Sequence, residues 1–374
     1  MSQVLRECRW GVLSCTQRGA SHVRQGLKNQ DAIDHYVSDD GAAPVILAVA
    51  DGHGSAKSFR SDIGAGFAVK TAVEVCRAFL EGIRGTSPPP TPSVVKNDAE
   101  QQIPRDIFRS WRQRVTDHVA ENPLTPEELD GLGEQAGEAA RKRAANPEQR
   151  YVAYGSTLLV AMLTDEFLIC FQLGDGDILA VYDGTDEAGR VIPKDETLIA
   201  NETTSLCQDD GFRHFRCQFK PLNQDCLPGL VLLSTDGYCN SFASPGAFLK
   251  VGTDYLNMLR SDGAEEIGKN LSTWLDETSR NGSGDDITVG IIYRRQPRLE
   301  KAVVRQAEAE SAGSVSTAEA AIETNAASDP AAPAGESAVP VSESPIGDPA
   351  EHGSKGLLKG LIGSAMGLFG KRGE

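Results

Sequence analysis

Several features that mark particular classes of protein are missing from this chain of 374 residues. It has no run of about 18 apolar residues, so no segment is predicted to cross a membrane as a helix. The first 26 residues lack an apolar stretch of signal-peptide length, and none of the eight cysteines forms a Cys-X-X-Cys pair. We therefore expect a cytoplasmic protein with reduced thiols, and neither a disulfide framework nor a zinc site.

An excess of positive charge is also missing. The formal net charge is −16, whereas binding the phosphates of nucleic acid requires a basic surface. We therefore expect no nucleic-acid partner, and a nuclease is a disfavoured function. Charged residues make up 24% of the chain and hydrophobic residues 40%, which is typical of a globular protein with an ordinary core.

The most informative stretch that is present covers residues 45–54. Residues 45–50 are all apolar, and a short continuous apolar run predicts a strand buried on both faces. The run ends in Asp51-Gly52-His53-Gly54. A carboxylate at the end of a buried strand projects past the sheet edge, and glycine lets the backbone turn and a ligand approach it. The same arrangement recurs where the apolar run 229–233 leads into Ser-Thr-Asp-Gly.

The remainder of residues 1–296, which we interpret as one domain, alternates between strand and helix patterns. Strands are predicted at residues 9–15, 33–37, 45–50, 156–163, 167–173, 178–182, 215–219, 229–233 and 287–293. Helices are predicted at 55–83, 101–120, 126–143, 248–258 and 264–276, and residues 19–30 are predicted to be a loop. Hairpin-linked strands and paired helices together predict an α+β fold, with two antiparallel sheets packed face to face and helices outside them.

Two segments of different composition follow this domain. Residues 297–352 are rich in Ala, Ser, Glu and Pro and contain no aromatic residue, which predicts a disordered linker. On a helix, the apolar residues of 353–374 would occupy one half and the glycines the other. We interpret this Gly-rich amphipathic segment as a docking element for a protein partner or a membrane surface. A tail without a role is the alternative.

Carboxylates stand beside the predicted strand ends. They are Asp31, Asp51, Asp236 and Asp285, with Asp175 in a hairpin turn. Like charges packed together either raise a pKa or recruit a cation, and oxygen ligands without a His-Cys cluster indicate Mg²⁺ or Mn²⁺. Two such ions would share a bridging water and lower its pKa, and the resulting hydroxide would attack a phosphoryl group. His53 would protonate the leaving oxygen. For His53 and Asp175 the alternative is an ordinary turn residue.

Six motifs occur in order along the chain. They are Asn-Gln-Asp-Ala at 29–32, Asp-Gly-His-Gly at 51–54, Tyr-Gly-Ser-Thr at 154–157, Gly-Asp-Gly-Asp at 174–177, Ser-Thr-Asp-Gly at 234–237 and Gly-Asp-Asp-Ile-Thr-Val at 284–289. Over about residues 9–294 the chain is therefore similar to the type 2C, metal-dependent serine/threonine protein phosphatases, particularly bacterial members. The resemblance implies a central antiparallel β-sandwich flanked by helix pairs, in four layers α-β-β-α. It also implies a two-metal centre at one end and phosphoproteins as substrates.

The resemblance assigns ligand roles to matching positions. Asp51 would bridge both ions, and the Gly52 carbonyl would be a further ligand. Asp236 and Asp285 would hold one ion. Asp31 would contact the metal shell directly or through water.

The chain departs from the family pattern at several of these motifs. Gln30 stands where Glu is common, and its amide has no charge to offer a metal-bound water. Glycine occupies the position of the usual phosphate-binding Arg, so the nearby Arg24 and His22 are the candidates for that role. Asp286 replaces the common Asn.

A third, weaker ion would use Asp175, but Asn240 replaces the Asp expected to help bind it. Two hypotheses therefore stay open. The first is a phosphatase that hydrolyses phosphoserine and phosphothreonine through a metal-bridged hydroxide, with a role in signalling. The second is a catalytically weak, phosphatase-like binding or regulatory module that docks a partner through its C-terminal segment.

Overall fold

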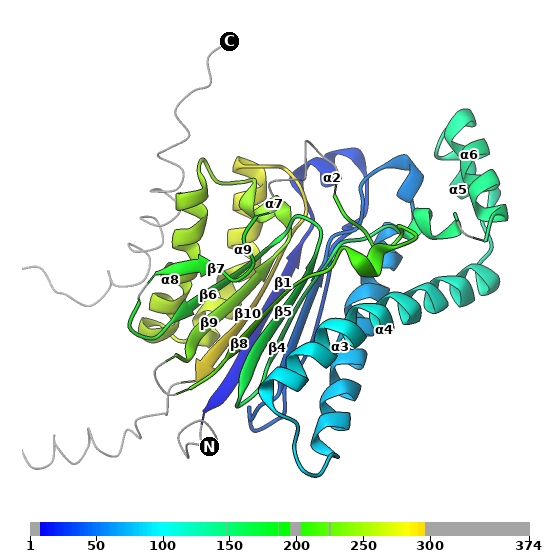
Figure 1. The fold of residues 1–374 in the computed structure, drawn as a ribbon. Coiled ribbons are helices and arrows are strands. Elements are labelled where there is room, and N and C mark those ends of the chain that lie inside the picture. Colours follow the sequence, from blue (N-terminus) through cyan, green and yellow to red (C-terminus); the bar gives the residue numbers. More distant parts are fainter. Residues whose placement is uncertain (1–7, 148, 186, 195–202, 224–225, 296–374) are drawn as a thin grey trace, which may run out of the picture. The chain divides into compact units, whose positions relative to one another are not determined.

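The computed structural model describes residues 8–147, 149–185, 187–194, 203–223 and 226–295. The linker predicted at 297–352 and the amphipathic segment predicted at 353–374 lie outside the described residues. The described chain forms two five-stranded sheets with antiparallel neighbours and with helices against both outer faces (Figure 1). The predicted α+β sandwich is confirmed.

The two sheets contain strands from both halves of the domain. Sheet A has the order β1 (Arg9–Gln17), β10 (Ile287–Arg295), β9 (Pro228–Ser234), β6 (Asp177–Tyr182) and β7 (Ala188–Arg190). Sheet B has the order β2 (Ala32–Tyr36), β3 (Val45–Ala50), β4 (Leu158–Leu163), β5 (Phe167–Leu173) and β8 (Arg216–Pro221).

Alternation along β3 shows how the layers are built. Val45, Leu47 and Val49 pack into the core between the sheets, whereas Ile46 and Ala48 face the core between sheet B and its helices. Successive side chains of a strand point to opposite faces, so a strand covered on both faces must be apolar throughout. A third core separates sheet A from the helices on its outer face. Three cores between four layers give the order α-β-β-α.

The helices form the two outer layers and several short connections. The pair α3 (Ser61–Arg84) and α4 (Pro92–Glu121) covers sheet B, and α8 (Pro245–Ser261) and α9 (Ala264–Asn281) cover sheet A. The short elements are α2 (Ala20–Gln25), α5 (Pro126–Asp130), α6 (Glu134–Ala145), α7 (Asp236–Cys239) and the 3-10 turns η1 (Ala56–Ser58), η2 (Arg150–Tyr154) and η3 (Gly211–Arg213). No helix of the described ranges is long and apolar enough to span a membrane.

Several local predictions were wrong. Residues 19–30 contain α2, which ends at Gly26 with φ 71°, a left-handed value that glycine adopts easily. The helix expected from residue 55 begins only at Ser61, because a 3-10 turn comes first. The single helix expected at 126–143 is two helices separated at Gly133, where φ is 78°. Strand β7 was not predicted, since three residues are too few to show a pattern.

Candidate active site

The strand registers bring the predicted carboxylates to one end of the sandwich. In sheet B, Ala32 pairs with Ala50, so the residues just outside that pair, Asp31 and Asp51, are neighbours. In sheet A, Ser234 at the end of β9 pairs with residues near the starts of both β10 and β6. Asp236, the first residue of α7, and Asp285, two residues before β10, therefore lie at the same end of sheet A. Figure 1 shows α2 and α7 at this end of the sandwich.

Hydrogen bonds link the acidic groups of the two sheets. The Thr235 hydroxyl, from the β9 side, donates to Asp31 Oδ2 over 2.9 Å. The carboxyl groups of Asp51 and Asp236 are close enough for each to shift the pKa of the other. The Asp51 backbone is held by Thr157, whose N–H donates to the Asp51 carbonyl at 2.8 Å and whose hydroxyl accepts the Asp51 N–H at 3.0 Å. Both sheets thus position one cluster of acids.

This cluster is electrostatically unfavourable as it stands. Burial raises the pKa of Asp31 well above its usual value, and the negative charge of Asp286 raises it further. Burial likewise raises the pKa of Asp51, together with the charges of Asp31 and Asp236. The pKa of Asp236 is also raised by burial and by Asp175. Each charged form is destabilised by its neighbours, and a divalent cation would relieve that repulsion.

The donor atoms fit a hard cation. Asp31 Oδ1 and Gln30 Oε1 are buried acceptors with no hydrogen-bond donor, although buried oxygens are normally paired. A Cβ on Gly52 would lie 2.6 Å from the Gln30 carbonyl oxygen, so the chain comes this close only because residue 52 is glycine. Within the described ranges no group of three or more His, Cys, Asp or Glu side chains is already arranged as a metal site. The oxygen donors lie at one end of the sandwich, but within the described ranges they do not form a complete set of ligands around one point.

Asp286 organises the loop beside the cluster. It is 4% exposed, and its carboxylate accepts the backbone N–H of Gly19 at 2.6 Å and of Gln30 at 2.7 Å. The Nδ1 atom of His22 lies 2.9 Å from Asp286 Oδ1, and its Nε2 atom lies 3.8 Å from Asp285 Oδ1. Asp286 therefore fixes both ends of the segment that contains α2, and it holds His22 against the acids.

Arg24 and His53 occupy the rim of the site. Arg24, on α2, donates to Ser21 Oγ at 2.9 Å at an exposed position, and no described contact joins it to the acids. The backbone N–H of His53 donates to the Gly155 carbonyl at 3.0 Å. Its side chain lines a cavity of about 340 Å³, and burial lowers its pKa despite the opposing charge of Asp175. His22 is thus brought to the carboxylates, whereas Arg24 lies near Gly284, the neighbour of Asp285, without a described contact to an acid.

A basic group beside Asp175 was missed by the sequence reasoning. Lys194 Nζ donates to the Asp175 carbonyl at 2.7 Å and lies 3.0 Å from Asp177 Oδ2. Arg190 Nε also donates to buried Asp177, over 2.6 Å. Asp177 was visible as the second acid of Gly-Asp-Gly-Asp, but nothing in the sequence pattern showed that two cations from residues 190–194 fold back onto it.

The chain matches a known protein family. Residues 18–276 match the family described as "Protein phosphatase 2C". No curated protein matches the chain. The matched range includes Asp31, Asp51, Asp175 and Asp236, and it ends before Asp285.

Solved structures provide further resemblances. The serine/threonine phosphatase Stp1 from Staphylococcus aureus is 13% identical, with a TM-score of 0.46 over 76% of this chain and 95% of that chain. The Mycobacterium tuberculosis serine/threonine phosphatase PstP/Ppp is 14% identical, with a TM-score of 0.42 over 77% of this chain and 100% of that one. A PstP catalytic domain in complex with two manganese ions is 16% identical, with a TM-score of 0.42 over 77% and 100% of the two chains.

Proposed function

Since this chain belongs to the protein phosphatase 2C family of serine/threonine protein phosphatases, we propose that it hydrolyses phosphoserine and phosphothreonine in proteins with the help of two divalent cations, Mn²⁺ or Mg²⁺. The observation that supports this most is the cluster of acids at one end of the sandwich. Three of its carboxyl groups have a raised pKa, and Asp31 Oδ1 is buried without a donor.

In this proposal, each acid has a separate role in binding the two cations. Asp51, at the end of β3, would bind both cations, and the Gly52 carbonyl would be a further ligand. Asp236 and Asp285, from the sheet A side, would hold one cation, and Asp31, from the sheet B side, would contact the metal shell directly or through water. When bound, the cations activate a water molecule for attack and offset charge on the phosphoryl group.

Protein groups around the ions have their own roles. Thr235 fixes the orientation of Asp31 through its 2.9 Å hydrogen bond. His53, at the cavity wall, gives its proton to the leaving oxygen of serine or threonine. His22 is held by carboxylates, whereas exposed Arg24 is able to swing toward a substrate phosphate. Asp175 would bind a third, weaker ion.

The test is hydrolysis of a phosphoserine peptide with Mn²⁺, with Mg²⁺ and with EDTA. We expect turnover that requires the metal, and a loss of about 100-fold or more in Asp51→Asn and Asp236→Asn, since even groups that only support a ligand cost 10–100-fold. Asp276→Asn is the matched control, because this residue pairs with Arg280 on the outside of α9. Wild-type rates in Asp51→Asn would reject the proposed site.

A catalytically weak binding module is the second candidate. The uncharged Gln30 amide, whose Oε1 is buried without a donor, and the hydrogen bond of Arg24 to Ser21 in place of a described contact with the acids favour it. Metal-dependent turnover by the wild type would dismiss this candidate. Docking through residues 353–374 is tested separately, by asking whether their deletion changes location or binding partners.

The domain limits belong to the same proposal. We assign residues 1–296 to the catalytic domain, since the family match lies inside them and the last described strand ends at Arg295. Residues 297–352 would be the linker and 353–374 the docking segment of a cytoplasmic signalling enzyme.

A further inference from the structure

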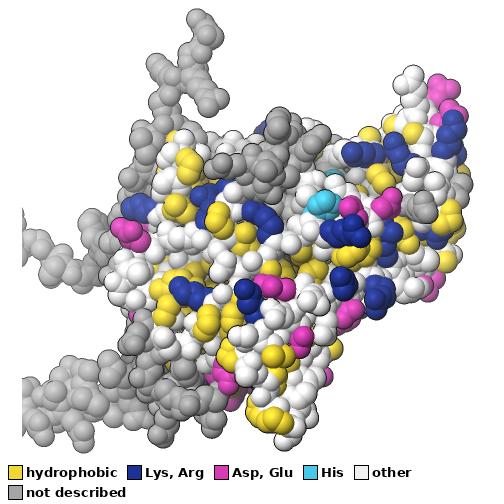
Figure 2. Space-filling model, viewed as in Figure 1, with side chains coloured by type: hydrophobic (Ala, Val, Ile, Leu, Met, Phe, Trp, Pro, Cys, Tyr) yellow, Lys and Arg dark blue, Asp and Glu magenta, His cyan; other side chains and the backbone are white. Residues whose placement is uncertain are grey.

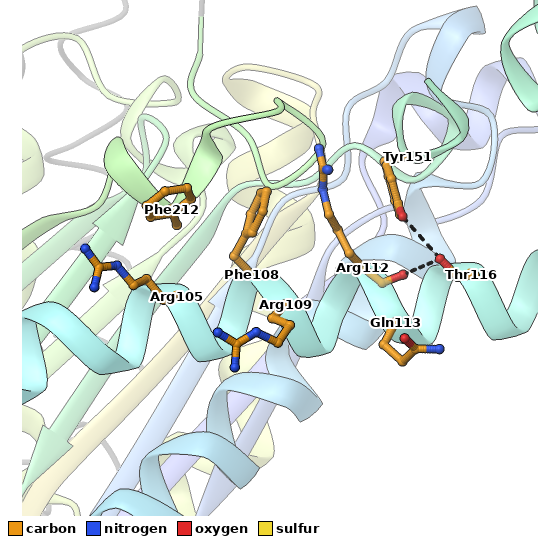
Figure 3. Close-up of a pocket in the computed structure, with 8 residues that line it drawn as sticks. All are labelled: Arg105, Phe108, Arg109, Arg112, Gln113, Thr116, Tyr151 and Phe212. Atoms are coloured by element: carbon orange, nitrogen blue, oxygen red, sulfur yellow. Dashed lines mark hydrogen bonds between the residues drawn. The ribbon is translucent and has the colours of Figure 1, made fainter. Parts of the chain in front are cut away.

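A second pocket lies away from the acidic cluster, on the outer side of α4. Its volume is about 410 Å³, and its walls come from α4, η2 and η3 (Figure 3). Besides Gln113 and Thr116, the residues that line it are arginines and aromatics: Arg105, Arg109, Arg112, Phe108, Tyr151 and Phe212. In a chain with net charge −16, this concentration of guanidinium groups is a local exception.

Two of the nearby arginines are available to a ligand. The guanidinium groups of Arg105 and Arg213 lie 5.9 and 5.6 Å from the ring centroid of Phe212. Both residues are exposed. Among the described residues neither forms an ion pair within 4.0 Å, although the carboxylate of Asp210 interacts electrostatically with Arg213. An aromatic ring with two exposed guanidinium groups beside it favours an anionic ligand, because each group can donate to a carboxylate and neither is held in a close ion pair.

The other two arginines are engaged internally. Arg109 lies 3.5 Å from Asp106, and Arg112 Nη2 donates to Asp209 Oδ1 at 2.9 Å. These acids neutralise only their own partners. Positive charge therefore remains at the Phe212 end of the pocket, where Arg105 lines the wall and Arg213 lies beside the Phe212 ring, and Asp210 offsets part of the Arg213 charge.

Aromatic packing keeps the pocket in shape. The rings of Phe108 and Phe212 are 5.5 Å apart. The Arg112 guanidinium is 4.5 Å from the Phe108 centroid and 4.3 Å from that of Tyr151, and Tyr151 Oη lies 3.2 Å from Thr116 Oγ1. In Figure 3, Phe108 and Arg112 rise from α4 toward Phe212 and Tyr151. The floor is thus preorganised and apolar, and it suits an apolar side chain placed next to the acid.

This pocket adjoins the cavity that contains His53. Arg112 also donates to the Gln208 carbonyl over 3.2 Å, and Gln208 and Asp209 line the His53 cavity. The segment that Arg112 binds therefore separates the two hollows. Figure 2 shows Lys and Arg side chains gathered over this part of the surface, with hydrophobic side chains between them. A peptide with its phosphorylated residue near His53 would extend across this boundary.

We propose that the pocket binds an acidic peptide segment, with carboxylates at Arg105 and Arg213 and an apolar side chain on the Phe108–Phe212 floor. Its role as a docking site for phosphoprotein substrates rests on the proposed phosphatase function. Binding of the acidic segment itself does not.

Binding is tested without catalysis. A fluorescein-labelled peptide of six glutamates around one tryptophan is titrated with the full chain in EDTA, and fluorescence anisotropy is recorded. We expect Arg105→Glu/Arg213→Glu to weaken binding by roughly tenfold, because two partly exposed ion pairs are lost and repulsion replaces them. Arg105→Gln/Arg213→Gln should give a smaller loss. The matched control, Lys269→Glu/Arg280→Glu, makes the same change in net charge on α9 and should bind as the wild type does.

Kinetics then separate docking from catalysis. With a phosphoserine peptide that has an acidic extension, the Glu variant should show a KM about tenfold higher at unchanged kcat. Hydrolysis of p-nitrophenyl phosphate, which is too small to reach the pocket, should not change. If the wild type hydrolyses neither substrate, the phosphatase proposal fails, and the anisotropy result still decides the pocket. Equal peptide affinity in wild type and the Glu variant, or tighter binding of a single-stranded oligonucleotide than of the acidic peptide, would overturn the inference.

Discussion

Removing the carboxylate of Asp286 is the sharpest test of how the site is held together. This side chain is 4% exposed and accepts two backbone N–H groups, from Gly19 at 2.6 Å and from Gln30 at 2.7 Å. In Asp286→Ala both donors lose their acceptor in a buried place. Each unsatisfied buried group costs about 1–3 kcal/mol, so the free energy of unfolding should fall by about 2–5 kcal/mol.

Asp286→Asn should lower the free energy of unfolding by less than Asp286→Ala does. The amide keeps one acceptor oxygen but turns an NH₂ group toward the second donor, so about half of the alanine cost, roughly 1–2 kcal/mol, is expected. This variant also removes a negative charge that raises the pKa of Asp31, which offsets part of the loss when no metal is bound.

The measurement is urea unfolding followed by circular dichroism, in EDTA so that metal binding does not contribute. Asp130→Ala is the control, because this side chain is 79% exposed and lies 3.8 Å from exposed Arg141, and surface changes usually stay within about 0.5 kcal/mol. An Asp286→Ala protein as stable as the control would refute the assigned role. The accompanying m-value should be unchanged, since the native surface is the same.

Three further predictions concern stability. A carboxyl whose pKa is raised by folding binds its proton more tightly in the native state, so the stability of the metal-free wild type should fall as pH rises above the unfolded pKa. Asp51→Asn should lose less stability over this window, since only Asp31 and Asp236 still titrate there with raised pKa values, and should be the more stable protein near pH 8 in EDTA, the two converging toward pH 4. Glu128→Ala leaves Arg60, which is 4% exposed, without its carboxylate and should cost about 2–3 kcal/mol in urea unfolding at pH 7. Because Arg60 lowers the Glu128 pKa, that difference should shrink as pH falls below about 4.5. Gly64→Ala places a Cβ against a backbone carbonyl of η2, so the free energy of unfolding should fall by about 2 kcal/mol despite the better helix propensity of alanine. In Gly66→Ala, in the same helix, the Cβ meets open space, so the free energy of unfolding should rise by about 0.5–1 kcal/mol. Thermal unfolding measures both.

The elements that sequence predicted well are those whose pattern is local. Residues 45–50 and 167–173 were placed as strands with the observed limits, because a continuous apolar run needs burial on both faces. The limits of α3 and α4 were less accurate. The periodic pattern started too late for α4, whose first residue, Pro92, was assigned to the preceding proline-rich stretch.

The site was predictable in its residues and not in its connections. The acids were identified because each stands beside a predicted strand end in the sequence. The distances between them could not be predicted in this way. The contacts of Asp286 with residues 19 and 30, or of Lys194 with Asp175, join parts of the chain that no periodicity relates. The register that makes Asp31 and Asp51 neighbours also became known only from the sheet.

The location of the acids explains how one chain tolerates buried like charges. Each acid lies just outside a regular strand, whereas the strands themselves form three apolar cores. The strand pairing therefore fixes the spacing of the acids, and burial of the three apolar cores offsets the destabilising repulsion between the carboxylates. Replacing an acid by its amide should then reduce chemistry and raise metal-free stability, but replacing a core residue should reduce both. If Asp51→Asn lowers the catalytic rate and raises metal-free stability, Asp51 belongs to a cation-binding site. If it changes stability alone, the acids only happen to lie at the same end of the sandwich.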